Sequence, residues 1–321
     1  MTSDRQCIRA KLDRRSACPK KIFEFSNLLC NSLIGKQNTL QCKAKNSGDS
    51  YDSKTNRKFR CHSKLWSRHF QQNLSHMDHV PWETDVDIPP HQSETIGRSI
   101  ATFQLGENSE GGTFKRSGRE YAEETGDHEY LNALDMFIKE ENRHSDVLGR
   151  FMDRQSIPKL EKEWTDSTFR FIRKIAGLNV CISVLLTAEI IASVYYRALG
   201  RATDSPVLLS ICEQILTDES HHLVFQASTL TKQRRNWSRL RCWAFNQLQR
   251  ILMAGTICVV WFEHGAVYQA GGYSFSKMAS ETWTSLENVL RIINHGVEGR
   301  LPTPSDTILP KENWLTVPLG K

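Results

Sequence analysis

Three features are missing from this 321-residue sequence, and each absence excludes a class of protein. No Cys-x-x-Cys pair occurs and the nine cysteines are odd in number, so neither a disulfide framework nor a tetrathiolate metal site is predicted. No run of 18 apolar residues occurs, and the most apolar stretch, residues 251–262, is too short to span a bilayer. No flavin- or nicotinamide-binding fingerprint is present. The cysteine usage suits a reducing compartment.

Acidic residues are scarce only in the first part of the chain. Residues 1–64 contain 15 Lys and Arg against 5 Asp and Glu, whereas residues 65–321 contain 27 against 31. The body of the protein is therefore mildly acidic, and nucleic-acid binding is not predicted. Residues 1–64 have the composition of a disordered leader or an organelle transit peptide. We expect a cytoplasmic protein, or an organelle protein if this segment is a transit peptide.

Alternating β patterns and internal repeats are also absent, and the pattern after Pro90 is helical almost to its end. Residues 65–93, with Trp and Pro, are expected to form an arm packed on the main domain. The main domain, residues 94–235, is predicted to be a four-helix bundle, with further helices packed on it over 236–295 and an irregular tail over 296–321. The four bundle helices are expected to begin at Ser93, near Asp127, near Thr165 and after Ser205–Pro206. The first is expected to end or kink at Gly111–Gly112.

Two of the predicted helices repeat a Glu-x-x-His spacing. Glu141 and His144 share one face of the second helix, and Glu219 and His222 share one face of the fourth. The first and third helices each carry one Glu among apolar neighbours, where an ionised carboxylate needs a partner or a metal. This is the ligand set of a dinuclear iron or manganese site in a four-helix bundle. The candidate ligands are Glu107, Glu141, His144, Glu189, Glu219 and His222.

The separations along the chain also fit a bundle. Glu107 and Glu141 are 34 positions apart, and Glu189 and Glu219 are 30 apart, so each interval fits two half-helices and a short loop. The 45 positions from His144 to Glu189 predict a long crossover between the second and third helices. Carboxylate and imidazole ligands without thiolates favour iron, with manganese as the alternative, over iron–sulfur clusters or structural zinc.

Several strings around these residues resemble known families. Residues 139–148 contain Glu-Glu-Asn-Arg-His, which is similar to the first iron-ligand motif of plant acyl-carrier-protein desaturases. Residues 103–110 (FQLGENSE) resemble the first ligand helix of rubrerythrin-like proteins. Asp218–Glu219 before His222 resembles the Asp-Glu-x-x-His motif of the desaturases and of ribonucleotide reductase small subunits. The resemblance covers about residues 94–235 and implies a ferritin-like, di-iron carboxylate protein.

The resemblance also implies roles for single residues. Each iron would be held by one isolated Glu and one Glu-x-x-His pair, and the two Glu of those pairs would bridge the irons. Asp218 would be an acceptor that orients a ligand histidine, and Glu110 is the alternative to Glu107. Leu148 stands where ribonucleotide reductase small subunits carry their radical tyrosine, so a radical-generating subunit is not implied. The two implied ligand sets are Glu107, Glu141 and His144, and Glu189, Glu219 and His222.

These expectations combine into a functional hypothesis. We expect a di-iron, O2-dependent oxidoreductase of the desaturase, hydroxylase or N-oxygenase type, acting on a small-molecule or carrier-bound apolar substrate. No catalytic residue beyond the metal ligands is predicted, and an external electron donor such as a ferredoxin is implied. The alternatives are a ferroxidase or iron-binding protein without an organic substrate, and a helical interaction protein without a working centre. A homodimer is an open alternative to a monomer, and no membrane span is expected.

Overall fold

The computed structural model describes residues 53–74, 79–84, 86–108, 112–161 and 177–308. Within these ranges the chain forms eight α-helices and a 3-10 turn (Trp82–Thr84), with no β-strand, which confirms the all-α class. The described residues belong to one unit, residues 51–321. Most of the expected leader, residues 1–52, lies outside the described residues, as does the end of the expected tail, residues 309–321.

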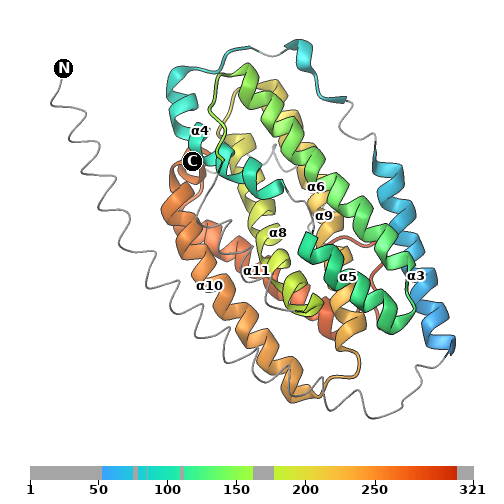
Figure 1. Cartoon of the computed structure of the whole chain (residues 1–321). Coiled ribbons are helices and arrows are strands. Elements are labelled where there is room, and N and C mark those ends of the chain that lie inside the picture. Colours follow the sequence, from blue (N-terminus) through green and yellow to red (C-terminus); the bar gives the residue numbers. More distant parts are fainter. Residues whose placement is uncertain (1–52, 75–78, 85, 109–111, 162–176, 309–321) are drawn as a thin grey trace. The chain divides into compact units, whose positions relative to one another are not determined.

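Four helices surround the centre of this unit (Figure 1). They are α4 (Pro90–Glu107), α6 (Glu129–Arg154), α8 (Leu178–Arg201) and α9 (Pro206–Arg234). Helix α9 begins as expected, because the Ser205 hydroxyl accepts a 3.2 Å hydrogen bond from the backbone N–H of Leu208 and Pro206 takes the first helical position. Residues 162–176, where the third helix was expected to begin, lie outside the described residues.

Side-chain contacts give the directions of the four helices. Along α8 and α9, Asn179 bonds Gln233 while Glu189 bonds Gln226, so the two helices run antiparallel. Asp127, just before the start of α6, contacts Lys232 near the end of α9. His144, later in α6, contacts Asp218, which is earlier in α9. Helices α6 and α9 are therefore antiparallel too.

The same test applies to α4. Gln104 bonds Ser145 of α6, while the earlier Gly97 lies close to Ile157, beyond the end of α6. Gln92 bonds Asp204, just beyond α8, while the later Ser99 bonds Tyr195 within it. Helix α4 is therefore antiparallel to both α6 and α8. Each helix around the centre runs opposite to its two neighbours, and the last turn of α4 lies beside the middle of α6.

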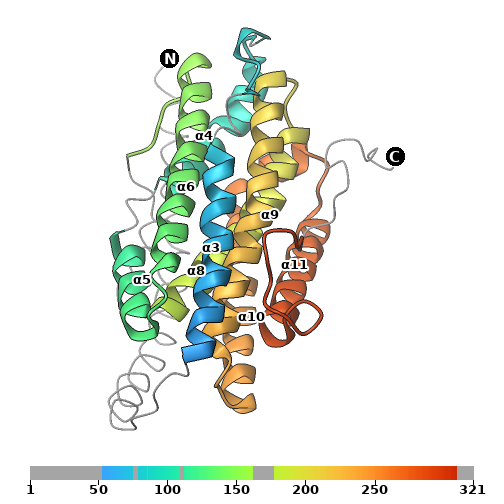
Figure 2. The ribbon, with the colours of Figure 1, turned by 90° about the vertical axis from the view of Figure 1, so that its right-hand side faces the viewer.

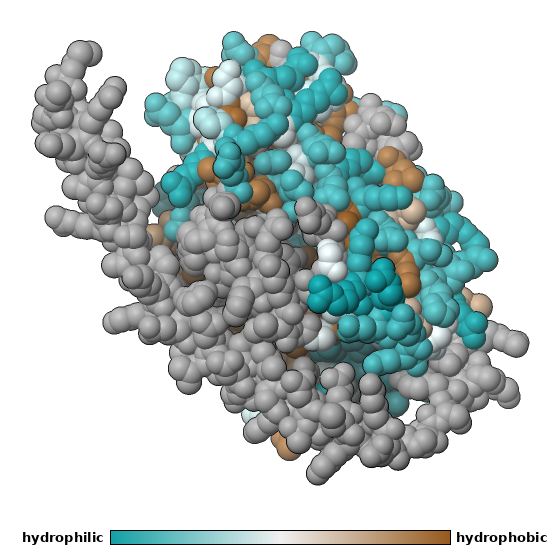
Figure 3. Space-filling model, in the orientation of Figure 1, coloured by the Kyte–Doolittle hydropathy of each residue, from teal (hydrophilic) through white to brown (hydrophobic). Residues whose placement is uncertain are grey.

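Four more helices pack around this set (Figure 2). Helix α3 (Ser53–Gln72) lies on α6, and α5 (Gly112–Thr125) lies on α6 and α8. Helix α10 (Arg239–Ala270) lies on α8 and α4, and α11 (Phe275–His295) lies on α9, α8 and α10. These last two helices fall where the sequence predicted additional helices. Figure 3 shows a largely hydrophilic described surface on the face that carries α5 and α6.

Two parts of the architecture differ from the expectations. Helix α4 ends at Glu107, and a separate helix, α5, begins at Gly112, where only the end or kink of the first helix was expected. The sequence of α5 is polar, and its buried face consists of small or polar residues apart from Phe114, so the face carries few apolar residues to mark it. Helix α3 begins at Ser53 and runs across residue 64, the expected boundary between leader and arm.

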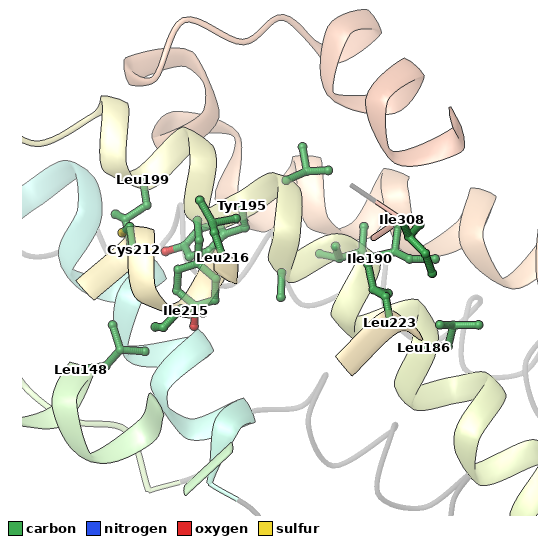
Figure 4. Packing of buried hydrophobic residues seen from close by; sticks show 14 of the residues in the cluster. Leu148, Leu186, Ile190, Tyr195, Leu199, Cys212, Ile215, Leu216, Leu223 and Ile308 are labelled. Atoms are coloured by element: carbon green, nitrogen blue, oxygen red, sulfur yellow. The ribbon is translucent and has the colours of Figure 1, made fainter. Parts of the chain in front are cut away.

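The core lies between the central helices. Figure 4 shows apolar side chains of α8 packed against those of α9. The labelled examples are Leu186, Ile190, Tyr195 and Leu199 from α8, and Cys212, Ile215, Leu216 and Leu223 from α9. By length and composition alone, α8 and α10 are apolar enough to cross a membrane, which is weak evidence of a span. The apolar window of α8 is 78% buried, as expected of a core helix, whereas that of α10 is 33% buried.

Candidate metal centre

The six candidate ligands lie in the interior, at the level where the four central helices meet. Glu107 is the last residue of α4, and Glu189 lies at the middle of α8. The two Glu-x-x-His pairs lie in the middle parts of α6 and α9. All six residues are buried, and the most exposed of them is 7% accessible to solvent. Burying this many ionisable groups is costly unless they are paired or bind a cation.

The structure brings the six residues together in two overlapping groups. Within each group, one ligand atom from every residue lies within 4.8 Å of the others. Glu141 and Glu219 belong to both groups, and the remaining residues belong to one group each. The groups are Glu107, Glu141, His144 and Glu219, and Glu141, Glu189, Glu219 and His222. Two adjacent positions that share two carboxylates are therefore available to metal ions.

Both imidazoles turn the same nitrogen toward this centre. His144 Nδ1 lies 3.7 Å from Glu219 Oε1 and 4.0 Å from Glu107 Oε2. His222 Nδ1 lies 2.8 Å from Glu141 Oε1 and 3.6 Å from Glu219 Oε2. The inward nitrogens are thus surrounded by carboxylate oxygens, while the Nε2 atoms are left for other partners.

Several buried atoms at the centre have no hydrogen-bond partner outside the cluster of six residues. They are Glu141 Oε1, His144 Nδ1, both carboxylate oxygens of Glu219 and His222 Nδ1, of which Glu141 Oε1 and His222 Nδ1 form an ion-pair contact at 2.8 Å. Leaving one such polar group unsatisfied costs about 1–3 kcal/mol. These atoms are the metal-binding atoms of their side chains, and they face a common point. The donor set of oxygen and imidazole nitrogen therefore fits one or two divalent transition-metal ions.

The electrostatics of the centre point the same way. Burial raises the pKa of Glu107, and it raises the pKa values of Glu141 and Glu219 well above normal. The charge of the nearby Glu189 raises all three further. Burial lowers the pKa of His222, but the combined effect of Glu141 and Glu219 outweighs it and the pKa rises well above normal. The cluster by itself therefore retains protons, and a bound cation would displace them.

The outward nitrogens of the two histidines contact carboxylates. His144 Nε2 lies 3.1 Å from Asp218 Oδ2, so Asp218 lies where the sequence predicted an orienting acceptor. His222 Nε2 lies 3.0 Å from Glu140 Oε2 in the same way. Burial raises the pKa of Asp218, but the hydrogen bond and the charge of His144, with the charges of His222 and Arg143, lower it overall. An ionised acceptor at Nε2 holds the Nε2 proton and leaves Nδ1 free to bind metal.

Arg143 joins the two orienting carboxylates. Its guanidinium donates a 2.7 Å hydrogen bond to Glu140 Oε1 and lies 3.6 Å from Asp218 Oδ2. It also donates to the backbone carbonyl of Asn73, whose side-chain amide donates to Asp218 Oδ1. Sequence reasoning missed the roles of Glu140 and Arg143. The available signal was their spacing of three, which places both residues beside the ligand pair on one turn of α6.

The two isolated glutamates receive neutral donors instead. The Tyr196 hydroxyl donates a 2.7 Å hydrogen bond to Glu107 Oε1, and burial holds the pKa of Tyr196 well above normal, so this donor stays protonated. The Gln226 amide donates a 2.7 Å hydrogen bond to Glu189 Oε1. Each bond fixes one carboxylate oxygen. Glu110, the alternative to Glu107, lies outside the described residues.

Comparisons with known proteins add no family assignment. No protein-family model, curated protein or solved structure matches this chain. The geometry of the buried cluster is therefore the basis on which a function can be inferred.

Proposed function

We propose that this chain is a ferritin-like, di-iron, O2-dependent oxidoreductase that acts on an apolar organic substrate by desaturation, hydroxylation or N-oxygenation. The observation that carries the proposal is the pair of buried ligand groups sharing Glu141 and Glu219, whose inward donor atoms have no hydrogen-bond partner outside the cluster. Shared carboxylates are what a dinuclear centre needs, because a bridging ligand keeps two cations close together.

The arrangement of the helices supports the ferritin-like part of the proposal. Each central helix is antiparallel to its neighbours, and a link of more than twenty residues joins α6 to α8. A bundle with one long crossover in this position is the ferritin-like connection. Part of this link lies outside the described ranges. The ferritin-like arrangement is therefore inferred from the contacts between the four central helices.

Each residue of the centre has a distinct task in this proposal. The Nδ1 atoms of His144 and His222 would each bind one iron, and Glu141 and Glu219 would bridge the two. Glu107 and Glu189 would complete the set, with one oxygen of each held by Tyr196 or Gln226. When bound, the two irons supply the redox equivalents that activate O2.

The surroundings of the centre support an apolar reaction space. The Phe137 ring lies 4.7 Å from the His222 ring, and Phe70 lies next to both. On the opposite side, Phe103 stacks on Tyr195 with ring centroids 3.5 Å apart. These groups exclude water, so charge interactions at the centre are strengthened. Since the sequence has no flavin or nicotinamide fingerprint, an external one-electron donor such as a ferredoxin would reduce the irons.

The alternative is a ferroxidase or iron-binding protein without an organic substrate. One observation favours it: none of the six candidate ligands is more than 7% exposed, and a ferroxidase needs only Fe²⁺ and O2 to reach the centre. The two candidates share the metal site and differ in what else must reach it.

The first experiment measures metal content. The purified full chain is reconstituted anaerobically with Fe²⁺, exposed to O2, and analysed for iron and for the absorption of an oxo-bridged diferric centre. We expect two irons per chain in the wild type, far less in Glu141→Gln, and two again in the control Glu213→Gln, whose side chain lies exposed on α9. Fewer than two irons in the reconstituted wild type would contradict the proposal.

A second experiment separates the two candidates. With excess Fe²⁺, a ferroxidase consumes O2 over many turnovers without another substrate and forms a large assembly in size-exclusion chromatography. An oxygenase stops after one oxidation of its own irons, and resumes only with an external reductant and an organic substrate. Mass spectrometry of ligands that co-purify with the protein would supply the substrate candidates.

A further inference from the structure

Helix α10 carries an apolar stripe that no described element covers. Between Leu240 and Ala266, every exposed residue of this helix is apolar. The stripe includes Leu240, Trp243, Ile251 and Phe262, which are 74%, 60%, 46% and 59% exposed. The other exposed residues within it are Ala254, Gly255, Cys258 and Ala266. An apolar face of this length on a soluble protein marks an interaction site.

The order of side chains along the stripe is partly self-complementary. If a second α10 lies antiparallel against the first, with the twofold axis between Ala254 and Gly255, two of the large side chains meet small ones. Trp243 faces the partner's Ala266, and Ile251 faces the partner's Cys258. The other two large side chains, Leu240 and Phe262, face the partner's Gln269 and the partner's Gln247. At the axis only small side chains meet, and Gly255 has nothing within 4 Å of the position a Cβ would take. Two helix backbones can therefore approach closely there.

Charge supports the same arrangement. The first turn of α10 contains no acidic residue and carries the exposed Arg239, an unfavourable place for a cation on its own helix. In the antiparallel pair, Arg239 lies opposite the partner's Ala270, at the carbonyl end of the other α10. A cation is favoured there, because the last carbonyls of a helix carry partial negative charge.

The area is sufficient for a stable contact. Thirty-two residues of helix extend about 48 Å at ~1.5 Å per residue, and a contact strip is about 10 Å wide. Each copy would therefore contribute about 500 Å², or about 1,000 Å² in total, which is the lower limit for a specific interface. A lipid surface would be the other apolar partner, but it gives no reason for small residues at the centre of the stripe.

We infer that α10 forms a twofold, antiparallel interface between two copies of this chain. This inference does not depend on the metal centre. The opposite side of α10 packs on α8 and α4, two of the four central helices. Dimer formation would therefore bury the outer side of a helix that packs directly on the central bundle. The interface is isologous, so each contact occurs twice and the assembly closes at two copies.

The test is a charge-pair design at one predicted contact. Full-length wild type is expected to sediment at twice the 36.8 kDa chain mass at micromolar concentration. Ile251→Lys alone, or Cys258→Glu alone, is expected to halve that mass, because each buries like or unpaired charges in the interface. The double variant is expected to restore the dimer, since each new lysine would then meet the partner's new glutamate.

Controls keep the outcome interpretable. Leu65→Lys, at a 42% exposed position on α3, is expected to leave the dimer intact. Unchanged helical circular dichroism and melting of the single variants would show that the fold survives. A monomeric wild type would overturn the inference, as would single variants that remain dimeric. A monomer that co-floats with phosphatidylcholine and phosphatidylglycerol vesicles would instead assign α10 to a membrane surface, and would also overturn it.

Discussion

Replacing Glu219 by Gln is expected to stabilise the metal-free protein and to weaken its response to iron. Glu219 is fully buried, its carboxylate oxygens have no hydrogen-bond partner outside the cluster, and burial together with the charge of Glu189 raises its pKa well above normal. Each buried unsatisfied group costs about 1–3 kcal/mol. The amide of Gln can donate to Glu189 and carries no charge, so the variant escapes part of this cost.

The expected size of the effect follows from these terms. Without metal, Glu219→Gln should raise the free energy of unfolding by about 1–3 kcal/mol. For a domain of this size, 1 kcal/mol corresponds to roughly 2–4 °C in melting temperature. With Fe²⁺ at 100 times its dissociation constant, each site adds about 2.7 kcal/mol to the wild type. The order of stability should therefore reverse between metal-free and iron-loaded protein.

The pH dependence gives an independent check of the same reasoning. Because the pKa of Glu219 is higher in the folded than in the unfolded state, the folded state binds more protons between the two values, and stability falls as pH rises through that interval. The metal-free wild type should thus lose stability above the normal carboxyl pKa, and Glu219→Gln should lose less of it.

The assay is thermal and chemical denaturation of both proteins, with and without Fe²⁺ under anaerobic conditions, at several pH values. Glu213→Gln, an exposed position on the same helix, is the matched control and should behave as the wild type. A Glu219→Gln variant that is no more stable without metal, and that gains as much from iron as the wild type, would refute the argument that these carboxylates form a cation site.

Three further outcomes are expected. Arg143→Gln should weaken Fe²⁺ binding at both positions by about 10–100-fold, measured by competition with a chelator, because it frees both orienting carboxylates; loss at only one position would contradict this. Tyr196→Phe should cost about 0.5–1.5 kcal/mol of stability through the lost hydrogen bond to Glu107, and an unchanged melting temperature would argue against that bond. Burial lowers the pKa of Lys232 to about 8, partly offset by Asp127. The unfolded state therefore binds more protons above pH 8, so stability should rise with pH toward the normal lysine pKa, and Lys232→Met should remove this slope in urea titrations.

The sequence was informative where one face of a helix carried both core and site residues. Glu141 and His144 interrupt the apolar stripe of α6 at helical spacing, so their burial followed from the period of the pattern. Glu189 was the only charged residue in an apolar stretch of α8, and it is buried together with the apolar residues around it. In these cases local periodicity and tertiary burial agree, so six residues on four helices could be selected together.

Other features depended on tertiary contacts that have no local signature. Glu140 lies next to Glu141 in sequence, and only the approach of α9 shows that it faces His222 and not solvent. The Tyr196 hydroxyl on α8 donates to Glu107 on α4, a contact that the sequence around neither residue indicates. Helix α5 packs on α6 and α8 through a face made mostly of small and polar residues, which a search for apolar side chains does not mark.

Arg143 gives the centre a property that neither histidine has alone. The Arg143 guanidinium contacts both Asp218, the partner of His144, and Glu140, the partner of His222. A rotation of one imidazole ring would therefore shift the carboxylate that orients the other ring. Iron binding at one position would then preorganise the other, and the bound iron would rise more steeply with iron concentration than two independent sites allow.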